Sequence, residues 1–269
     1  MRWWAHGAPS QVTLPLVMVD SGQSVSNGYL NFQAEYSAMV NTSLARSPKG
    51  QLSAYYNRVN NVVYFQVQVT NQSGTVLNYN TNGASVSAIL YEDARVQLTN
   101  RFARGVSEGS ITNLANGASA VYNLQVTAPA GVNWNKMHYL TLADYRPGGA
   151  SGAYDQLQAA IAAPTGVDPA GLFFLIKKSG TAASQSVTIA GLPSMSWTAA
   201  ASAPWINLSA ASGNASAPPQ ISVNPALLAD GYQSGTVSFQ APGNLLADSV
   251  SVSAYVYTNQ FFLPLTFKK

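Results

Sequence analysis

Apolar and polar residues alternate one by one over several short stretches of this sequence, and this period of two restricts the fold more than any other feature. In the clearest stretch, Val63, Phe65, Val67 and Val69 are separated by Tyr and Gln. Successive side chains of a strand point to opposite faces of the sheet, so this pattern predicts a half-buried strand. The same period recurs at 86–90, 122–126 and 137–145, between turn residues such as Gly, Asn and Pro.

Short strands at this spacing predict a mainly β chain with two immunoglobulin-like antiparallel β-sandwiches in tandem. The length of 269 residues fits about two domains of this kind. We expect the first sandwich over 47–163, a linker stiffened by two prolines over 164–170, and the second sandwich with an apolar tail over 171–269. Residues 154–161 fit either a strand or a short Ala-rich helix, and the strand is favoured.

Residues 1–46 form an N-terminal extension of a different kind. The apolar run Val12–Val19 predicts a strand, Asp20–Gly22 a turn, and the apolar residues from Tyr29 to Leu44 recur at helical spacing. This order of strand, turn and helix weakly resembles the C-terminal half of a thioredoxin-like fold. The Cys-x-x-Cys half of that fold is absent from the sequence, so the resemblance implies no redox activity.

The second predicted sandwich contains a set of turn and core motifs. They are Trp197-Thr198, Pro204-Trp205-Ile206, Ser212-Gly213 and Ser234-Gly235-Thr236-Val237. On these motifs, residues 171–258 resemble the BACON domain (Bacteroidetes-associated carbohydrate-binding often N-terminal), an immunoglobulin-like sandwich. An Arg that is common in that family before the penultimate strand is replaced here by Tyr232-Gln233-Ser234. The resemblance implies either a carbohydrate-binding or a spacer role.

The composition excludes several functions and favours association. Charged residues make up 9% of the chain, against roughly 25% in typical soluble proteins, and a weakly charged surface favours contacts between molecules. The sequence has no Lys or Arg from Ser179 to Thr266 and therefore lacks the clustered cations that phosphate backbones require. It also lacks cysteine and any apolar run long enough to span a membrane. We expect no nucleic acid, no membrane span and no cofactor.

Two patterns resemble catalytic motifs without meeting their structural requirements. Gly105-Val106-Ser107-Glu108-Gly109 matches the Gly-x-Ser-x-Gly nucleophile elbow, but its polar flanks predict a loop between strands, and the elbow needs a strand-to-helix turn. The histidines are His6 and His138, and the second lies in a predicted strand. We therefore expect no catalytic residue and no metal site.

Acidic residues are concentrated at Glu92-Asp93 and at Asp144. Neighbouring residues of a strand face opposite ways, so Glu92 and Asp93 are not expected to act on one substrate as the paired carboxylates of a glycosidase do. Asp93 with Arg95, and Asp144 with Arg146, are expected to form ion pairs on a sheet face.

Four aromatic residues are candidate stacking platforms for a glycan, with burial in a core as the competing interpretation. They are Trp134, Tyr145, Trp197 and Trp205. Candidate assembly contacts are the apolar residues near both ends of the sequence, since exposed apolar segments need a partner. They are Trp3, Trp4, Leu14, Leu16, Val17, Val19, Phe261, Phe262 and Phe267.

The leading functional hypothesis is a non-catalytic, extracellular or cell-surface structural subunit that binds copies of itself by strand addition at open sheet edges, as in a filament or surface layer. The second is a carbohydrate-binding module whose partner is a polysaccharide. The third is an accessory part of a thioredoxin-like secreted protein.

Overall fold

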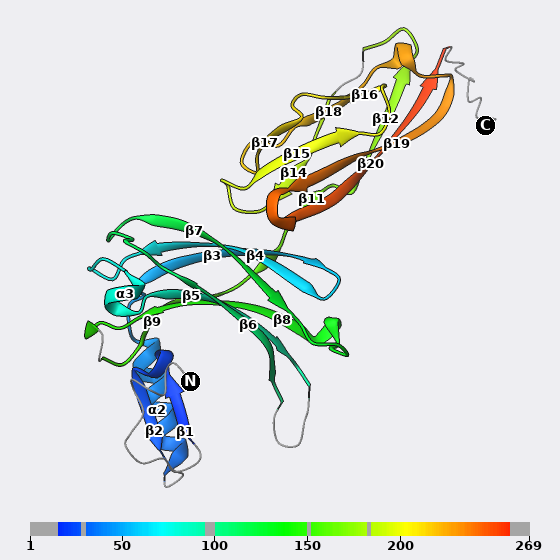
Figure 1. The fold of residues 1–269 in the computed structure, drawn as a ribbon. Helices are drawn as coiled ribbons and strands as arrows, with labels where there is room; N and C mark the ends of the chain where they lie inside the picture. Colours follow the sequence, from blue (N-terminus) through cyan, green and yellow to red (C-terminus); the bar gives the residue numbers. More distant parts are fainter. Residues whose placement is uncertain (1–15, 28–30, 95–99, 150–151, 182–183, 259–269) are drawn as a thin grey trace, which may run out of the picture. The chain divides into compact units, whose positions relative to one another are not determined.

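The computed structural model describes residues 16–27, 31–94, 100–149, 152–181 and 184–258, and the chain divides into two compact units, Met1–Ala163 and Pro164–Lys269 (Figure 1). The described part is mainly β, with antiparallel sheets in both units, which confirms the predicted mainly β class.

Two facing sheets form the sandwich of unit 1 (Figure 1). The first has the order β10-β3-β4-β7, with β10 (Ala163–Pro164), β3 (Gly50–Val59), β4 (Val62–Asn71) and β7 (Ser119–Thr127). The second has the order β6-β5-β8-β9, with β6 (Phe102–Ser110), β5 (Ser85–Glu92), β8 (Met137–Tyr145) and β9 (Asp155–Ile161). The short helices α3 (Tyr79–Asn82) and η2 (Trp134–Lys136) lie in the connections.

The core of unit 1 consists of the inward side chains of both sheets. Val63, Phe65 and Val67 of β4 are fully buried, as are Val86 and Leu90 of β5. These are the apolar positions of the alternating stretches, so the strand prediction for 63–69 and 86–90 is confirmed. The strand alternative for 154–161 is also confirmed, since β9 covers 155–161.

The Gly-x-Ser-x-Gly motif lies within strand β6, so the loop predicted for it is wrong. A Cβ atom on Gly105 would come 2.6 Å from Val126 Cγ1, and one on Gly109 would come 3.0 Å from Leu124 Cδ2. Both contacts are with strand β7 of the facing sheet. The two glycines let the sheets approach each other, and the motif has no strand-to-helix turn.

The N-terminal segment of unit 1 contains the predicted strand, turn and helix, with an additional strand between the turn and the helix. Strand β1 (Leu16–Val19) pairs antiparallel with β2 (Ser24–Asn27) across the turn η1 (Asp20–Gly22), and helix α2 (Phe32–Leu44) follows. Residues 12–15 of the predicted strand lie outside the described residues. The structure describes every residue of α2, and none of them is buried.

Unit 2 contains a five-stranded sheet, β12-β20-β19-β15-β17, and a three-stranded sheet, β13-β18-β16. Their bounds are β12 (Gly171–Lys177), β20 (Leu246–Tyr257), β19 (Gly231–Ala241), β15 (Ser196–Ala201), β17 (Ser212–Asn214), β13 (Gln185–Ser186), β18 (Gln220–Val223) and β16 (Ile206–Leu208). The short helices η4 (Pro225–Leu227) and η5 (Pro242–Asn244) lie in its loops. Strand β12 runs parallel to β20.

Part of the predicted linker is structured. Strand β11 (Gly166–Asp168) pairs with β14 (Thr188–Ala190), and Val167 is buried while its N–H donates to Asp248 Oδ2 at 2.8 Å. The apolar side chain of Val167 explains why this stretch packs into unit 2 although prolines flank it.

The motifs of unit 2 are pairs of a large core side chain and a glycine. Trp197 is buried beside Gly213, where a Cβ would come 2.8 Å from Trp197 Cζ2. A Cβ on Gly235 would come 2.8 Å from Ile206 Cδ1 and 3.2 Å from Trp205 Cζ2. The glycines leave room for the indoles, so the spacing of the motifs reflects core packing.

Replacing Gly213 with alanine tests this packing. We expect Gly213→Ala to lower the free energy of unfolding of unit 2 by about 1–3 kcal/mol, because the buried Trp197 ring cannot move aside. Gly171→Ala is the control, since its Cβ would come no closer than 3.7 Å to Ser251 O. Urea unfolding of both variants measures the difference, and equal stabilities would contradict the packing argument.

Candidate functional site

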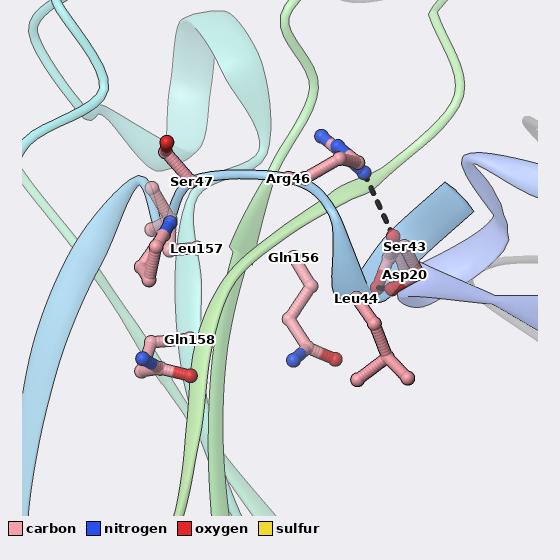
Figure 2. Close-up of a pocket in the computed structure, with 9 residues that line it drawn as sticks. Asp20, Ser43, Leu44, Arg46, Ser47, Gln156, Leu157 and Gln158 are labelled. Carbon is pink, nitrogen blue, oxygen red and sulfur yellow. Dashed lines mark hydrogen bonds and ion pairs between the residues drawn. The ribbon is translucent and has the colours of Figure 1, made fainter. Parts of the chain in front are cut away.

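A network of ion pairs joins the N-terminal segment to the sandwich of unit 1. Arg46, two residues after helix α2, donates from Nη1 to Asp20 Oδ2 at 2.8 Å and from Nη2 to Asp155 Oδ1 and Oδ2 at 2.7 and 2.6 Å. Lys49 Nζ donates to Asp155 Oδ2 at 2.7 Å. Ser43 of α2 donates to Asp20 Oδ1 at 2.7 Å. Figure 2 shows Arg46 pointing toward Asp20. We call this network the ionic junction.

Asp155, the first residue of β9, is the centre of the ionic junction. Its side chain is 1% exposed, and two cations face it. A buried carboxylate is stable only when such partners replace its hydration. The hydrogen bond to Asp155, opposed by desolvation, raises the pKa of both Arg46 and Lys49. The junction therefore fixes the segment on the sandwich through charge.

A hollow of about 210 Å³ lies beside the ionic junction (Figure 2). Its lining includes Leu44 of α2 and Gln156 and Gln158 of β9, together with Asp20 and Arg46. Asp20 and Arg46 already bind each other, and amide and hydroxyl groups make up the remaining polar lining. This chemistry suits hydrogen bonding.

Helix α2 exposes large apolar side chains. Phe32, Val40 and Leu44 are 52%, 45% and 78% exposed. Residues four apart lie on one flank of a helix, so Val40 and Leu44 are neighbours. Tyr36 and Met39 are partly covered. An apolar helix flank in water is a site for association.

The predicted assembly contacts lie only partly within the described residues. Val17 and Val19 are partly exposed in β1, and Leu16 begins that strand. The others, Trp3, Trp4, Leu14, Phe261, Phe262 and Phe267, fall outside the described residues.

Three of the four predicted stacking residues are in cores, which corrects that prediction. Tyr145, Trp197 and Trp205 are buried, and a ring needs an open face to stack on a sugar. Trp197 also donates from Nε1 to Asn214 O at 2.8 Å. Trp134 in η2 is partly exposed, and the Arg58 guanidinium lies 4.5 Å from the centre of its ring.

The titratable residues considered for catalysis form separate structural contacts. His138 Nε2 lies 2.7 Å from Asp93 Oδ2, and its ring stacks on Tyr91 at 4.6 Å. Asp93 also pairs with Arg101 at 3.6 Å. The expected partner Arg95 lies outside the described residues.

Glu92 and Asp144 bind residues other than His138 and Asp93. Glu92 accepts hydrogen bonds from the Asn133 N–H at 3.0 Å and from Arg104 Nε at 2.7 Å. The bond from Asn133 contributes most to lowering the pKa of Glu92, and Arg104 lowers it further. Asp144 is buried and accepts from Ser85 Oγ at 3.4 Å. It lies six residues from His138 on β8, or about 20 Å along the strand. The three groups do not converge on one substrate.

The ionic junction was missed in the sequence because its members are far apart in the chain. Arg46 and Asp155 are 109 residues apart, and no short motif contains both. The charges of Asp155, Arg46 and Lys49 were visible among few others, but pairing them required the fold.

Among the described residues, no group of three or more His, Cys, Asp or Glu could hold a metal ion. No helix in the described part of the chain is long and apolar enough to cross a membrane.

Comparisons with known proteins give only matches to solved structures, at very low identity and low TM-score. No family model matches the chain, and no curated protein matches it. Solved structures similar to it include zebrafish RET cadherin-like domains 1 to 4, with 9% identity, a TM-score of 0.30, and coverage of 78% of this chain and 52% of that one. Drosophila N-cadherin EC1-3 has 9% identity, a TM-score of 0.29, and coverage of 80% and 91%. Titin Ig tandem domains have 7% identity, a TM-score of 0.24, and coverage of 79% and 100%. The chain thus spans about half of the zebrafish RET structure.

Removing the central carboxylate tests the ionic junction. We expect Asp155→Asn to lower the free energy of unfolding of unit 1 by about 2 kcal/mol, since Arg46 and Lys49 lose their buried partner. Asp93→Asn is the control, because its exposed ion pairs should contribute at most about 1 kcal/mol. Urea unfolding compares the two variants, and an equal loss would contradict a special role for Asp155.

The raised pKa of Lys49 predicts a pH dependence of stability. A raised folded-state pKa gives stabilisation that is complete below the unfolded pKa of about 10.4 and is lost as the pH rises through the higher folded value. We expect Lys49→Met to be less stable than wild type near neutral pH and to lack this alkaline loss. Thermal unfolding, followed by circular dichroism between about pH 8 and pH 11, measures the loss of stability in wild type and in Lys49→Met. Lys136→Met is the control.

Proposed function

We propose that this chain is a non-catalytic structural or adhesive module that binds copies of itself outside the cell. The observation that carries the proposal is helix α2, which exposes Phe32, Val40 and Leu44 and buries none of its residues. A helix of 13 residues is marginal by itself in water, and most helices in proteins are stabilised by packing of an apolar face. A partner over α2 would supply that packing.

The charge distribution supports a partner of the same kind. Residues 16–45 contain two charged side chains, Asp20 and Glu35. Asp20 is paired with Arg46, and Glu35 accepts from Ser26 Oγ at 2.7 Å. Two copies of this segment therefore meet with little electrostatic repulsion, and the apolar contact determines the association.

The ionic junction supports a role in assembly. Association is stronger when the binding element is already held in place, because less conformational freedom is lost. Arg46, two residues after the end of α2, binds Asp155 of the sandwich and so holds the segment there. The helix is thus presented as a fixed surface.

A second candidate function is glycan binding by unit 2, as the BACON resemblance implies. The outward face of β12, β20 and β19 exposes Phe173, Tyr255 and Tyr232, and Tyr232 Oη lies 2.9 Å from Ser253 Oγ. Rings and hydroxyl groups on one flat face suit the apolar and polar faces of a sugar. A glycan array with Tyr232→Ala and Tyr255→Ala tests this function, and loss of a bound glycan without unfolding would favour it.

Sedimentation velocity tests self-association. We expect the wild-type chain to form oligomers whose size rises with concentration, and Val40→Glu combined with Leu44→Gln to be monomeric at the same concentrations. Leu227→Glu is the control, since Leu227 is equally apolar and 57% exposed but lies in unit 2. A wild-type chain that stays monomeric at every concentration would remove the proposal.

A further inference from the structure

The second sheet of unit 1 has an apolar row on its outer face. Val106 of β6, Ile89 of β5, Leu140 of β8 and Ile161 of β9 are paired in register across all four strands. Val106 is 60% exposed and Ile161 is 65% exposed, and the two central residues are partly exposed. We call these four residues the apolar row. Cross-strand neighbours of this kind form one continuous surface.

Part of this outer face is already covered by the molecule's own N-terminal segment. Leu142, two residues along β8 from the apolar row, is buried and lines a hollow with Met18, Ser21 and Gln156. The segment therefore packs on the face at Leu142, while Val106 and Ile161 remain open.

Unit 1 thus carries two apolar surfaces of different shape. A helix of 13 residues is about 20 Å long, and a row across four strands spans about 14 Å. Layers in proteins are commonly a helix packed on a sheet face. The flank of α2 is long enough to cover the apolar row and shares its apolar character.

From this match we propose that helix α2 of one copy packs on the apolar row of a second copy. The inference rests on the proposed self-association and names the surfaces that make it. The contact joins two unlike surfaces. Two copies can therefore each pack their helix on the other's row, or each copy can bind the next one along an open chain.

Charged side chains lie near both surfaces. The one charged residue of α2 is Glu35, in its first turn. On the outer face, Arg101 lies over the Tyr91 ring at 5.9 Å, and its side chain is 75% exposed. Glu108 pairs with Ser87 on the other side of the apolar row. Glu35 already accepts from Ser26 Oγ at 2.7 Å, and Arg101 already pairs with Asp93 at 3.6 Å. These charges therefore leave the contact to its apolar residues.

A mixing experiment with full-length variants tests the contact. A row variant, Val106→Lys with Ile161→Lys, and the helix variant, Val40→Glu with Leu44→Gln, are each expected to be monomeric by sedimentation velocity. Mixed at equal concentrations, they should form a one-to-one complex, because one copy keeps an intact helix and the other an intact row. Val121→Lys is the matched control, since Val121 is an exposed strand valine on β7 of the other sheet.

The outcomes separate this inference from the proposed function. If the row variant associates as wild type does, or the mixture stays monomeric, the contact between α2 and the apolar row is wrong and self-association still stands. If wild type itself is monomeric, self-association fails.

The sequence contains no cysteine, so a mixture of Val40→Cys and Val106→Cys offers an independent test. Oxidation should give a disulfide-linked heterodimer. Its absence, while wild type still associates, would overturn the contact.

Discussion

The ion pairs of the Asp155 carboxylate are the interactions on which the arrangement of unit 1 depends. The carboxylate is buried at the start of β9 and receives Arg46 from the end of the N-terminal segment and Lys49 from the approach to β3. A buried charge without partners costs several kcal/mol, so β9 is more stable when the segment and the connection are in place. This links a short segment with little core of its own to a sandwich that has a large one.

The two sandwiches illustrate how much a period of two can predict. Stretches whose apolar residues alternate, such as 63–69 and 86–90, were assigned correctly because the same residues form the core. Strand β6 was missed because its inward positions include Gly105 and Gly109, which carry no apolar signal. The facing strand β7 requires glycine there, and that requirement exists only in three dimensions.

The functional residues were harder to predict than the fold, for a related reason. A tryptophan in a sequence can serve a core or a ligand, and Trp197 and Trp205 serve the core. Their glycine partners, Gly213 and Gly235, were visible as turn or strand residues, but their contacts with the indoles were not. Likewise, the helix at 32–44 was predicted from its apolar spacing. The spacing does not say what covers the apolar flank, and Val40 and Leu44 are exposed.

That exposure is the physical basis for the assembly that we propose. A monomeric protein could cover Val40 and Leu44 with its own chain or replace them with charged residues, as many exposed helices do. Here the charged fraction is 9%, and the helix has one charge. An in-register apolar row lies on the outer face of the same unit, beside the place where the segment packs on Leu142. A helix flank and a sheet face each lose water when they meet, and at about 25 cal/mol per Å² of apolar area the gain rises with every side chain covered. Association through these two surfaces would therefore complete the layer that the described chain leaves open.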